Sequence, residues 1–242
     1  MKQPRVVVVS FMKSGRTWLK VIHEAYLHKV RYEGLKPDEL VKWTHLGFGN
    51  LEDTNVKRFY PAYDQLPVCK GFEEWREKFP KTPLVLLRRD PADVMTSLWH
   101  DERVRNQHRT KEYDNIDAFV EGTSIRLNRF AASAQEMGLK FEYKLSYEQM
   151  QRDTFRAIKP VFDLIHNGKT NDDALRSAIE KCEFDTLSKK ERKGQVDMRV
   201  AERFKKNGFY KTRKGKVGSA DEELREGLAD TIREQYSAIQ KL

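Results

Sequence analysis

The residues best suited to chemistry lie in a short stretch near the start of the chain. Residues 10–17, SFMKSGRT, nearly match the phosphate-binding pattern G-x-x-x-x-G-K-[ST], with Ser10 at the first Gly and Arg16 at the Lys. A loop of this kind wraps backbone N–H groups around an anion at the start of a helix, and Lys13, Ser14 and Thr17 add side-chain donors. The stretch therefore predicts a phosphate or sulfate site; a Ser-Gly turn without ligand is the alternative for this motif alone.

Two further groups of residues supply positive charge. Arg89 precedes a helix predicted to begin near Pro91, and Ser97 lies about two turns into it, so both could approach an anion. An Arg at a strand end followed by Asp-Pro is equally a device that starts a helix, which is the alternative for this motif alone. Asp93 is interpreted as a structural or helix-dipole carboxylate. Residues 213–218, RKGKVG, combine cations with glycines that let a backbone come close to a ligand, and a solvated basic loop is the alternative.

The elements that must position these residues alternate between strands and helices. Residues 6–9 and 84–87 are apolar runs of strand length, and residues 141–145 are interpreted as a third strand. Helices are predicted over residues 18–30, 92–101, 116–137, 155–165, 172–182 and 220–239. The alternation predicts an α/β fold with a central parallel β-sheet flanked by helices on both faces, and residues 42–71 are expected to be irregular.

Composition narrows the function classes. A chain of 242 residues with 38% hydrophobic residues suits a single domain over residues 1–242. Cys69 and Cys182 lack metal-ligand spacing and are expected to be reduced, buried thiols.

The net charge of +9 is concentrated in residues 186–216, which contain twelve basic residues and three acidic ones. This surplus indicates an anionic partner or a solvated helix face. Without a membrane span or signal-peptide core, the expected location is cytoplasmic.

Four motifs in order resemble the sulfotransferase family that uses 3′-phosphoadenosine 5′-phosphosulfate (PAPS). Residues 11–18, FMKSGRTW, are similar to the family's Tyr-Pro-Lys-Ser-Gly-Thr-Thr-Trp loop, and residues 89–97 resemble its Arg-Asn-Pro-x-Asp-Val-x-x-Ser motif. Residues 147–150, YEQM, resemble its Tyr-Glu-Asp-Met, and residues 213–218 resemble its late Arg-Lys-Gly-x-x-Gly. The resemblance covers nearly the whole chain and implies a P-loop-like fold that binds PAPS and releases 3′-phosphoadenosine 5′-phosphate (PAP), with no metal required.

The resemblance also implies a role for each site residue. The 5′-phosphosulfate would be held by Lys13, Ser14, Gly15, Thr17 and Trp18, with Arg16 either adding a cation beside it or pointing away. The 3′-phosphate would be held by Arg89 and Ser97 and clamped by Arg213, Lys214 and Gly215. Tyr147 would contact the adenine, and Phe184 would stack near the base. A dedicated 3′-phosphate site would separate this donor from ATP.

Sulfuryl transfer resembles phosphoryl transfer, an in-line displacement in which the protein positions groups and neutralises charge. Lys13 is the expected cation at the departing phosphate, and a base must take the proton of the acceptor. The family usually supplies a His within Lys-Thr-His after a strand, but here Lys70 is followed by Phe72 at the expected His position. His45, in the pair Thr44-His45, is therefore the predicted base, and Lys70 is the next candidate.

Other functions compete with this interpretation. A P-loop kinase would explain the first loop, but the Lys-Ser/Thr pair is absent and residues 84–87 lead into Arg88 and Arg89 rather than a magnesium-binding Asp. A nucleic-acid binder would explain the basic segment alone, so no nucleic-acid partner is expected. The expected acceptor is a small molecule. Aromatic residues in 35–65, with residues 101–114, either line an aromatic or lipid-like acceptor site or form a local core. The oligomeric state is left open.

Overall fold

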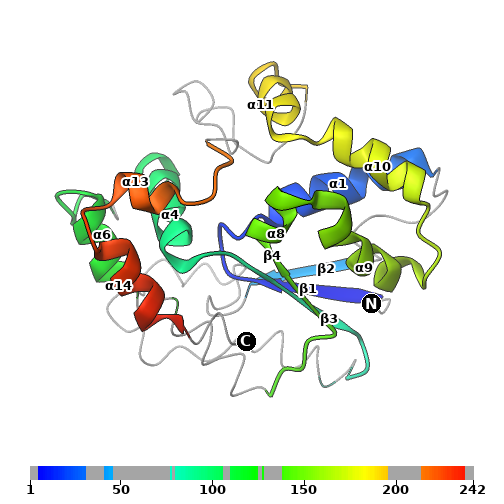
Figure 1. The fold of residues 1–242 in the computed structure, drawn as a ribbon, viewed down its shortest axis with the longest axis horizontal. Helices are drawn as coiled ribbons and strands as arrows, with labels where there is room; N and C mark the ends of the chain where they lie inside the picture. Colours follow the sequence, from blue (N-terminus) through cyan, green and yellow to red (C-terminus); the bar gives the residue numbers. More distant parts are fainter. Residues whose placement is uncertain are drawn as a thin grey trace.

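A four-stranded parallel sheet forms the centre of the computed structural model, which describes residues 5–30, 41–45, 80–105, 110–124, 138–195 and 214–237 together with residues 77 and 127. The strands are β1 (Val6–Ser10), β2 (Val41–His45), β3 (Leu84–Arg88) and β4 (Tyr143–Ser146), in the order β2-β1-β3-β4. All three pairings are parallel (Figure 1). The predicted α/β fold with a parallel sheet is therefore confirmed.

The two central strands are buried on both faces, as their continuous apolar runs predict. Val7 and Val9 of β1 belong to one hydrophobic cluster, whereas Val6 and Val8 belong to another. The alternation follows from the two-residue period of a strand, which sends successive side chains to opposite faces. β3 divides in the same way. The sheet thus separates two cores, and each core needs its own cover of helices.

One cover, the α4 layer, consists of four helices from the middle and the end of the described chain. They are α4 (Pro91–Arg105), α6 (Ile116–Thr123), α13 (Ser219–Glu223) and α14 (Leu228–Gln235). Figure 1 shows these four helices gathered on one side of the sheet. Their core residues include Met95, Phe119 and Ile232, each at most 1% exposed.

The opposite cover, the α1 layer, contains a cluster of neighbouring rings. It consists of α1 (Arg16–Lys29), α8 (Tyr147–Arg152), α9 (Thr154–His166), α10 (Asp172–Lys181) and α11 (Phe184–Arg192). Tyr26 and Phe162 meet edge to face at 5.2 Å between ring centroids, and His166 lies 4.8 Å from Tyr26 and 5.8 Å from His23. Burial, assisted by the charge of Arg5, lowers the pKa of His166 to about 4, so the ring is neutral at pH 7.

Three element predictions were wrong. Helix α6 ends at Thr123, where a single helix over residues 116–137 was predicted; between 124 and 137 the described residues are 124 and 127. Side-chain hydrogen bonds explain the end of α6, because the Thr123 hydroxyl donates to the Phe119 carbonyl at 2.6 Å and the Ser124 hydroxyl accepts from Tyr236 at 2.9 Å.

The predicted helix 220–239 is broken at Gly227, whose φ of 76° is left-handed. Strand β2 lies within residues predicted to be irregular.

Cys182, a predicted buried thiol, is 2% exposed, and burial raises its pKa to about 11. Cys69 lies outside the described residues. Among the helices that the structure describes, none has the length and apolar character needed to cross a membrane.

Candidate active site

The register of the sheet brings the predicted site segments to one edge. Ser10, the last residue of β1, is paired with His45 in β2 and with Leu87 in β3, and Arg88 is paired with Ser146. The chain segments that leave these strands therefore begin side by side at the carboxyl edge of the sheet. In open α/β sheets this edge is the place where ligands bind.

The loop after β1 turns tightly before helix α1 begins. Lys13 and Gly15 both have left-handed backbone angles, with φ of 63° and 95°. Gly15 is the N-cap of α1 without a side-chain capping bond, so the first backbone N–H groups of the helix are available to an anion. A Cβ atom at Gly15 would lie 2.6 Å from Cδ2 of Tyr147, which requires glycine at this position.

Ser14 lies in the same loop and is almost fully buried, with 1% of its surface exposed. Its hydroxyl has no hydrogen-bond partner among the residues that the structure describes. A buried hydroxyl usually donates or accepts at least one hydrogen bond. The loop therefore contains an unused donor beside the open helix start.

Arg89 connects three parts of the site. One Nη atom donates to the backbone oxygen of Lys13 at 3.3 Å, and the other donates to the backbone oxygen of Lys216 at 3.1 Å. The guanidinium also lies over the ring of Tyr147, 4.3 Å from its centroid. These contacts hold the first loop, the segment at 214–218 and helix α8 around one cation.

Asp93 completes this junction from the first turn of α4. Its side chain is fully buried and accepts from the backbone N–H groups of Gly218 and Ala220 at 2.9 Å each, and from the Ser219 hydroxyl at 3.2 Å. Arg89 contacts the same carboxylate at 3.4 Å. Asp93 is therefore structural, since it caps the start of α13 and fixes the segment that precedes it.

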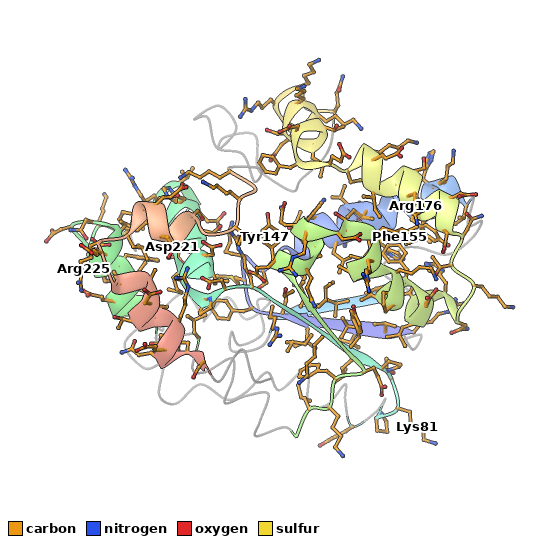
Figure 2. All side chains as sticks on the ribbon, in the orientation of Figure 1. Lys81, Tyr147, Phe155, Arg176, Asp221 and Arg225 are labelled. Atoms are coloured by element: carbon orange, nitrogen blue, oxygen red, sulfur yellow. The ribbon has the colours of Figure 1, made fainter. Side chains whose placement is uncertain are left out.

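Aromatic side chains form the wall on the α1 side. Trp18 meets Tyr147 edge to face at 5.9 Å, and the indole N–H donates to the Cys182 carbonyl at 2.8 Å. The Tyr147 hydroxyl accepts from Gln151 at 2.8 Å, and burial raises its pKa, so the phenol is neutral. In Figure 2, Tyr147 lies between the α4 layer and the α1 layer, at the end of the sheet.

Two cations near this wall are engaged by carboxylates of the protein. Lys214 contacts Glu223 at 2.7 Å, and the other oxygen of Glu223 lies 2.5 Å from Nε2 of His100. Lys13 contacts Asp101 of α4 at 3.2 Å. Sequence reasoning missed Asp101; its spacing of four residues from Ser97, which places both on one face of α4, was the available signal.

The structure thus unites many of the predicted residues. Lys13, Ser14, Gly15, Trp18, Arg89 and Tyr147 form one contact network, while Arg16 and Thr17 open helix α1 and Ser97 lies half-buried in α4. Phe184, at the start of α11, packs on Gly215 so closely that a Cβ there would clash with its ring. Lys214 and Gly215 precede Lys216, which Arg89 contacts. His45 is the last residue of β2, but the structure does not describe its side chain. Lys70 and Arg213 lie outside the described residues. The roles of all these residues remain predictions.

Comparison with known proteins identifies relatives along the whole chain. Residues 3–242 match the family described as "Sulfotransferase domain". Cytosolic sulfotransferase 16 of Arabidopsis thaliana is 25% identical over 244 residues, covering 88% of this chain and 69% of the relative. Cytosolic sulfotransferase 12 of the same plant is 23% identical over 261 residues, covering 96% of this chain and 76% of the relative.

Solved structures show the same fold. Mouse sulfotransferase SULT7A1 complexed with PAP aligns with a TM-score of 0.62 and 15% identity, covering 100% of this chain and 86% of that one. Retinol dehydratase in complex with retinol and PAP aligns with a TM-score of 0.58 and 15% identity, covering 100% of this chain and 82% of that one. The same dehydratase has also been solved with androsterone and PAP.

Proposed function

The chain belongs to the sulfotransferase family and is a sulfotransferase enzyme, and we propose that it transfers a sulfuryl group from PAPS to a hydroxyl or amine of a small molecule. The observation that carries the proposal is the junction at the carboxyl edge of the sheet. There Arg89 links the loop of Lys13 to the segment at Lys216, so two cationic segments distant in sequence flank one region.

The residues at this junction fit a donor with two anionic ends. The open start of α1 and the buried, unpartnered hydroxyl of Ser14 supply donors for a phosphosulfate. The Nε atom of Arg89 is buried and has no partner among the described residues, and Lys214 lies in the adjoining segment. These groups support Arg89, Ser97, Lys214 and Gly215, with Arg213, as the site of the 3′-phosphate.

The chemical step is a single displacement at sulfur. The acceptor oxygen or nitrogen forms a bond to sulfur, the bond between sulfur and the bridging phosphate oxygen breaks, and PAP leaves with that electron pair. Lys13 neutralises the charge that grows on the leaving phosphate. The acceptor loses its proton to a base of the protein, so that the products are PAP, the sulfated acceptor and a protonated base.

His45 is our candidate for that base. The pairing of its backbone with Ser10 brings it to the strand end from which the Lys13 loop departs, which supports a position near the reacting atoms. Lys70 is the second candidate, either as a base or as a further cation.

The acceptor is proposed to be a small aromatic or lipid-like molecule. Retinol and androsterone, bound in solved retinol dehydratase, are apolar alcohols, which supports this class. A cytoplasmic location is supported by the names of the Arabidopsis relatives. A kinase is not favoured, because the family match is to sulfotransferases and β3 ends at Arg88, followed by Arg89.

Calorimetric titration with PAP, AMP and ATP in the absence of magnesium tests the donor. We expect PAP to bind at least about 100-fold more tightly than AMP, because the 3′-phosphate forms charge-assisted hydrogen bonds that AMP lacks. Equal affinities for PAP and AMP, or a preference for ATP once magnesium is added, would contradict the proposal.

A second arm tests the base through sulfuryl transfer to 2-naphthol, a simple aromatic alcohol. His45→Ala should reduce the transfer rate by about 100-fold or more and leave PAP affinity unchanged, because a general base contributes to the chemical step alone. Near-normal transfer in His45→Ala, with a large loss in Lys70→Ala, would move the role to Lys70.

A further inference from the structure

The ammonium group of Lys13 is held by a carboxylate from a distant part of the chain. Asp101 Oδ1 lies 3.2 Å from Lys13 Nζ, across 88 positions of sequence. The two side chains are only 20% and 11% exposed. An ion pair this shielded is screened less by solvent than a surface pair, so it restricts the lysine more strongly.

The backbone of Lys13 is fixed as firmly as its side chain. Its φ of 63° lies in the left-handed region, which non-glycine residues adopt only when their surroundings impose it. Arg89 holds its carbonyl oxygen at 3.3 Å. Lys13 is therefore held at its main chain by a residue that follows β3 and at its ammonium by Asp101, one turn beyond Ser97 in α4.

A carboxylate in this position has an electrostatic disadvantage for an enzyme with an anionic donor. It competes with a phosphate or phosphosulfate for the ammonium group of Lys13, so the ion pair with Asp101 lowers donor affinity. Such a group is useful when it orients the cation before the donor arrives, because catalysis depends on groups that are already in place.

We propose that Asp101 is the positioning residue for Lys13: it holds the ammonium in the donor-free enzyme and gives up part of this contact to the phosphate of the donor. The inference rests on the proposed function, since it takes Lys13 as the cation at the leaving phosphate. Asp101 touches Lys13 and acts on the donor through that side chain.

Calorimetric titration of PAP into the wild type and Asp101→Asn tests the inference. The isosteric amide removes the competing charge, so we expect PAP to bind about tenfold more tightly to the variant. Asp101→Glu restores the charge and should return the affinity to within about threefold of the wild type. A residue with only a structural role would weaken binding or leave it unchanged, and either result in Asp101→Asn overturns the proposal.

A double-mutant cycle shows whether Asp101 acts through Lys13. In a Lys13→Gln background, Asp101→Asn should change PAP affinity by less than about threefold, because the contact is already absent. A full tenfold gain in that background would mean that Asp101 acts independently of Lys13 and would contradict the positioning role.

Asp163→Asn is the matched control, since Asp163 forms a similar pair with Lys159 at 2.7 Å on the far part of the α1 layer. It should not alter PAP affinity. The experiment also separates the two proposals: absence of PAP binding in the folded wild type refutes the proposed donor, whereas wild-type binding without a change in Asp101→Asn refutes only the role of Asp101.

Discussion

The two helical layers both enclose apolar cores, but they differ in the polar groups that are buried beside those cores. In the α1 layer, rings and aliphatic side chains meet around Phe162, and even a histidine, His166, is buried in its neutral form. In the α4 layer, the fully buried carboxylate of Asp93 joins α4 to α13. Both layers support the sheet through apolar contacts, and in the α4 layer a buried charge also fixes the segment at 214–218, which we propose binds the donor.

Arg233 shows how charged side chains connect the helices of the α4 layer. From α14 it donates to Asp90 at 2.8 Å and to both oxygens of Asp221 at 2.7 and 2.9 Å. These bonds raise the pKa of Arg233, while the bond from Arg233 lowers the pKa of Asp221. The start of α4 and the helices after the basic segment are thus joined by directional, charge-assisted hydrogen bonds in addition to the apolar contacts of their shared core.

The largest expected effect comes from removing the buried carboxylate of Asp93 in the α4 layer. Asp93→Ala leaves Arg89 and two backbone N–H groups without their acceptor, so the free energy of unfolding should fall by about 3–5 kcal/mol. PAP affinity should fall as well, because the segment at 214–218 loses its anchor. Denaturant unfolding and calorimetry measure the two effects.

Asp230→Ala is the control for Asp93. Asp230 also contacts Arg233, at 2.9 Å, but its side chain is 77% exposed, so the loss should be about 0.5 kcal/mol or less. Equal losses in the two variants would remove the distinction between a buried and a surface carboxylate in this layer.

The α1 layer should make the stability of the protein depend on pH through His166. Its pKa is about 4 in the folded protein and 6.5 in the unfolded chain, so the unfolded state takes up the proton first as the pH falls. The free energy of unfolding should therefore decrease between pH 6.5 and pH 4, by roughly 3 kcal/mol in total from this group, and stay level below that range.

Denaturant unfolding at a series of pH values measures this dependence. In His166→Gln the contribution should vanish, and the difference between variant and wild type isolates it from other titrating groups. An identical acid dependence in both proteins would show that His166 is not the group responsible.

A smaller effect is expected where the two layers meet. Gly15→Ala adds a Cβ that meets Tyr147 in a left-handed conformation, so we expect a loss of about 1–3 kcal/mol in stability and weaker PAP binding. Gly138→Ala is matched to it, since Gly138 also has a left-handed φ of 55° but nothing lies within 4 Å of a Cβ there. The control should lose about 1 kcal/mol and keep its PAP affinity. Loss of affinity in the control would contradict the specific role of the Gly15 contact.

Much of the fold follows from the sequence because the central strands are buried on both faces. The runs at residues 6–9 and 84–87 are apolar without interruption, and such runs are typical of parallel strands. Strand β2, Val41–His45, has polar residues at alternate positions and follows no apolar run, so its pairing with β1 depends on the sheet rather than on local pattern.

The site was predictable in its residue types but not in its internal contacts. The loop around Lys13 carries its own signal, since glycine, lysine and serine at that spacing are suited to anions. The partner of Lys13 carries a weaker signal, the spacing of four residues between Ser97 and Asp101. Asp101 reaches it only because α4 leaves the sheet beside β1, and this placement depends on the order of the strands. Tertiary placement therefore determines the electrostatics, and sequence spacing does not.

The contacts of Arg233 have a consequence for biosynthesis. A ribosome makes the chain from its first residue, so the anion-binding loop and the start of α4 emerge long before their partners in α13 and α14. Until then Asp93 has no start of α13 to cap and Asp90 lacks the guanidinium of Arg233, so both carboxylates are solvated by water. The nascent chain can build the sheet and the α1 layer early. The contacts around Asp93 and Asp90 form only after α13 and α14 have been made, so we expect donor binding to begin no earlier than that point.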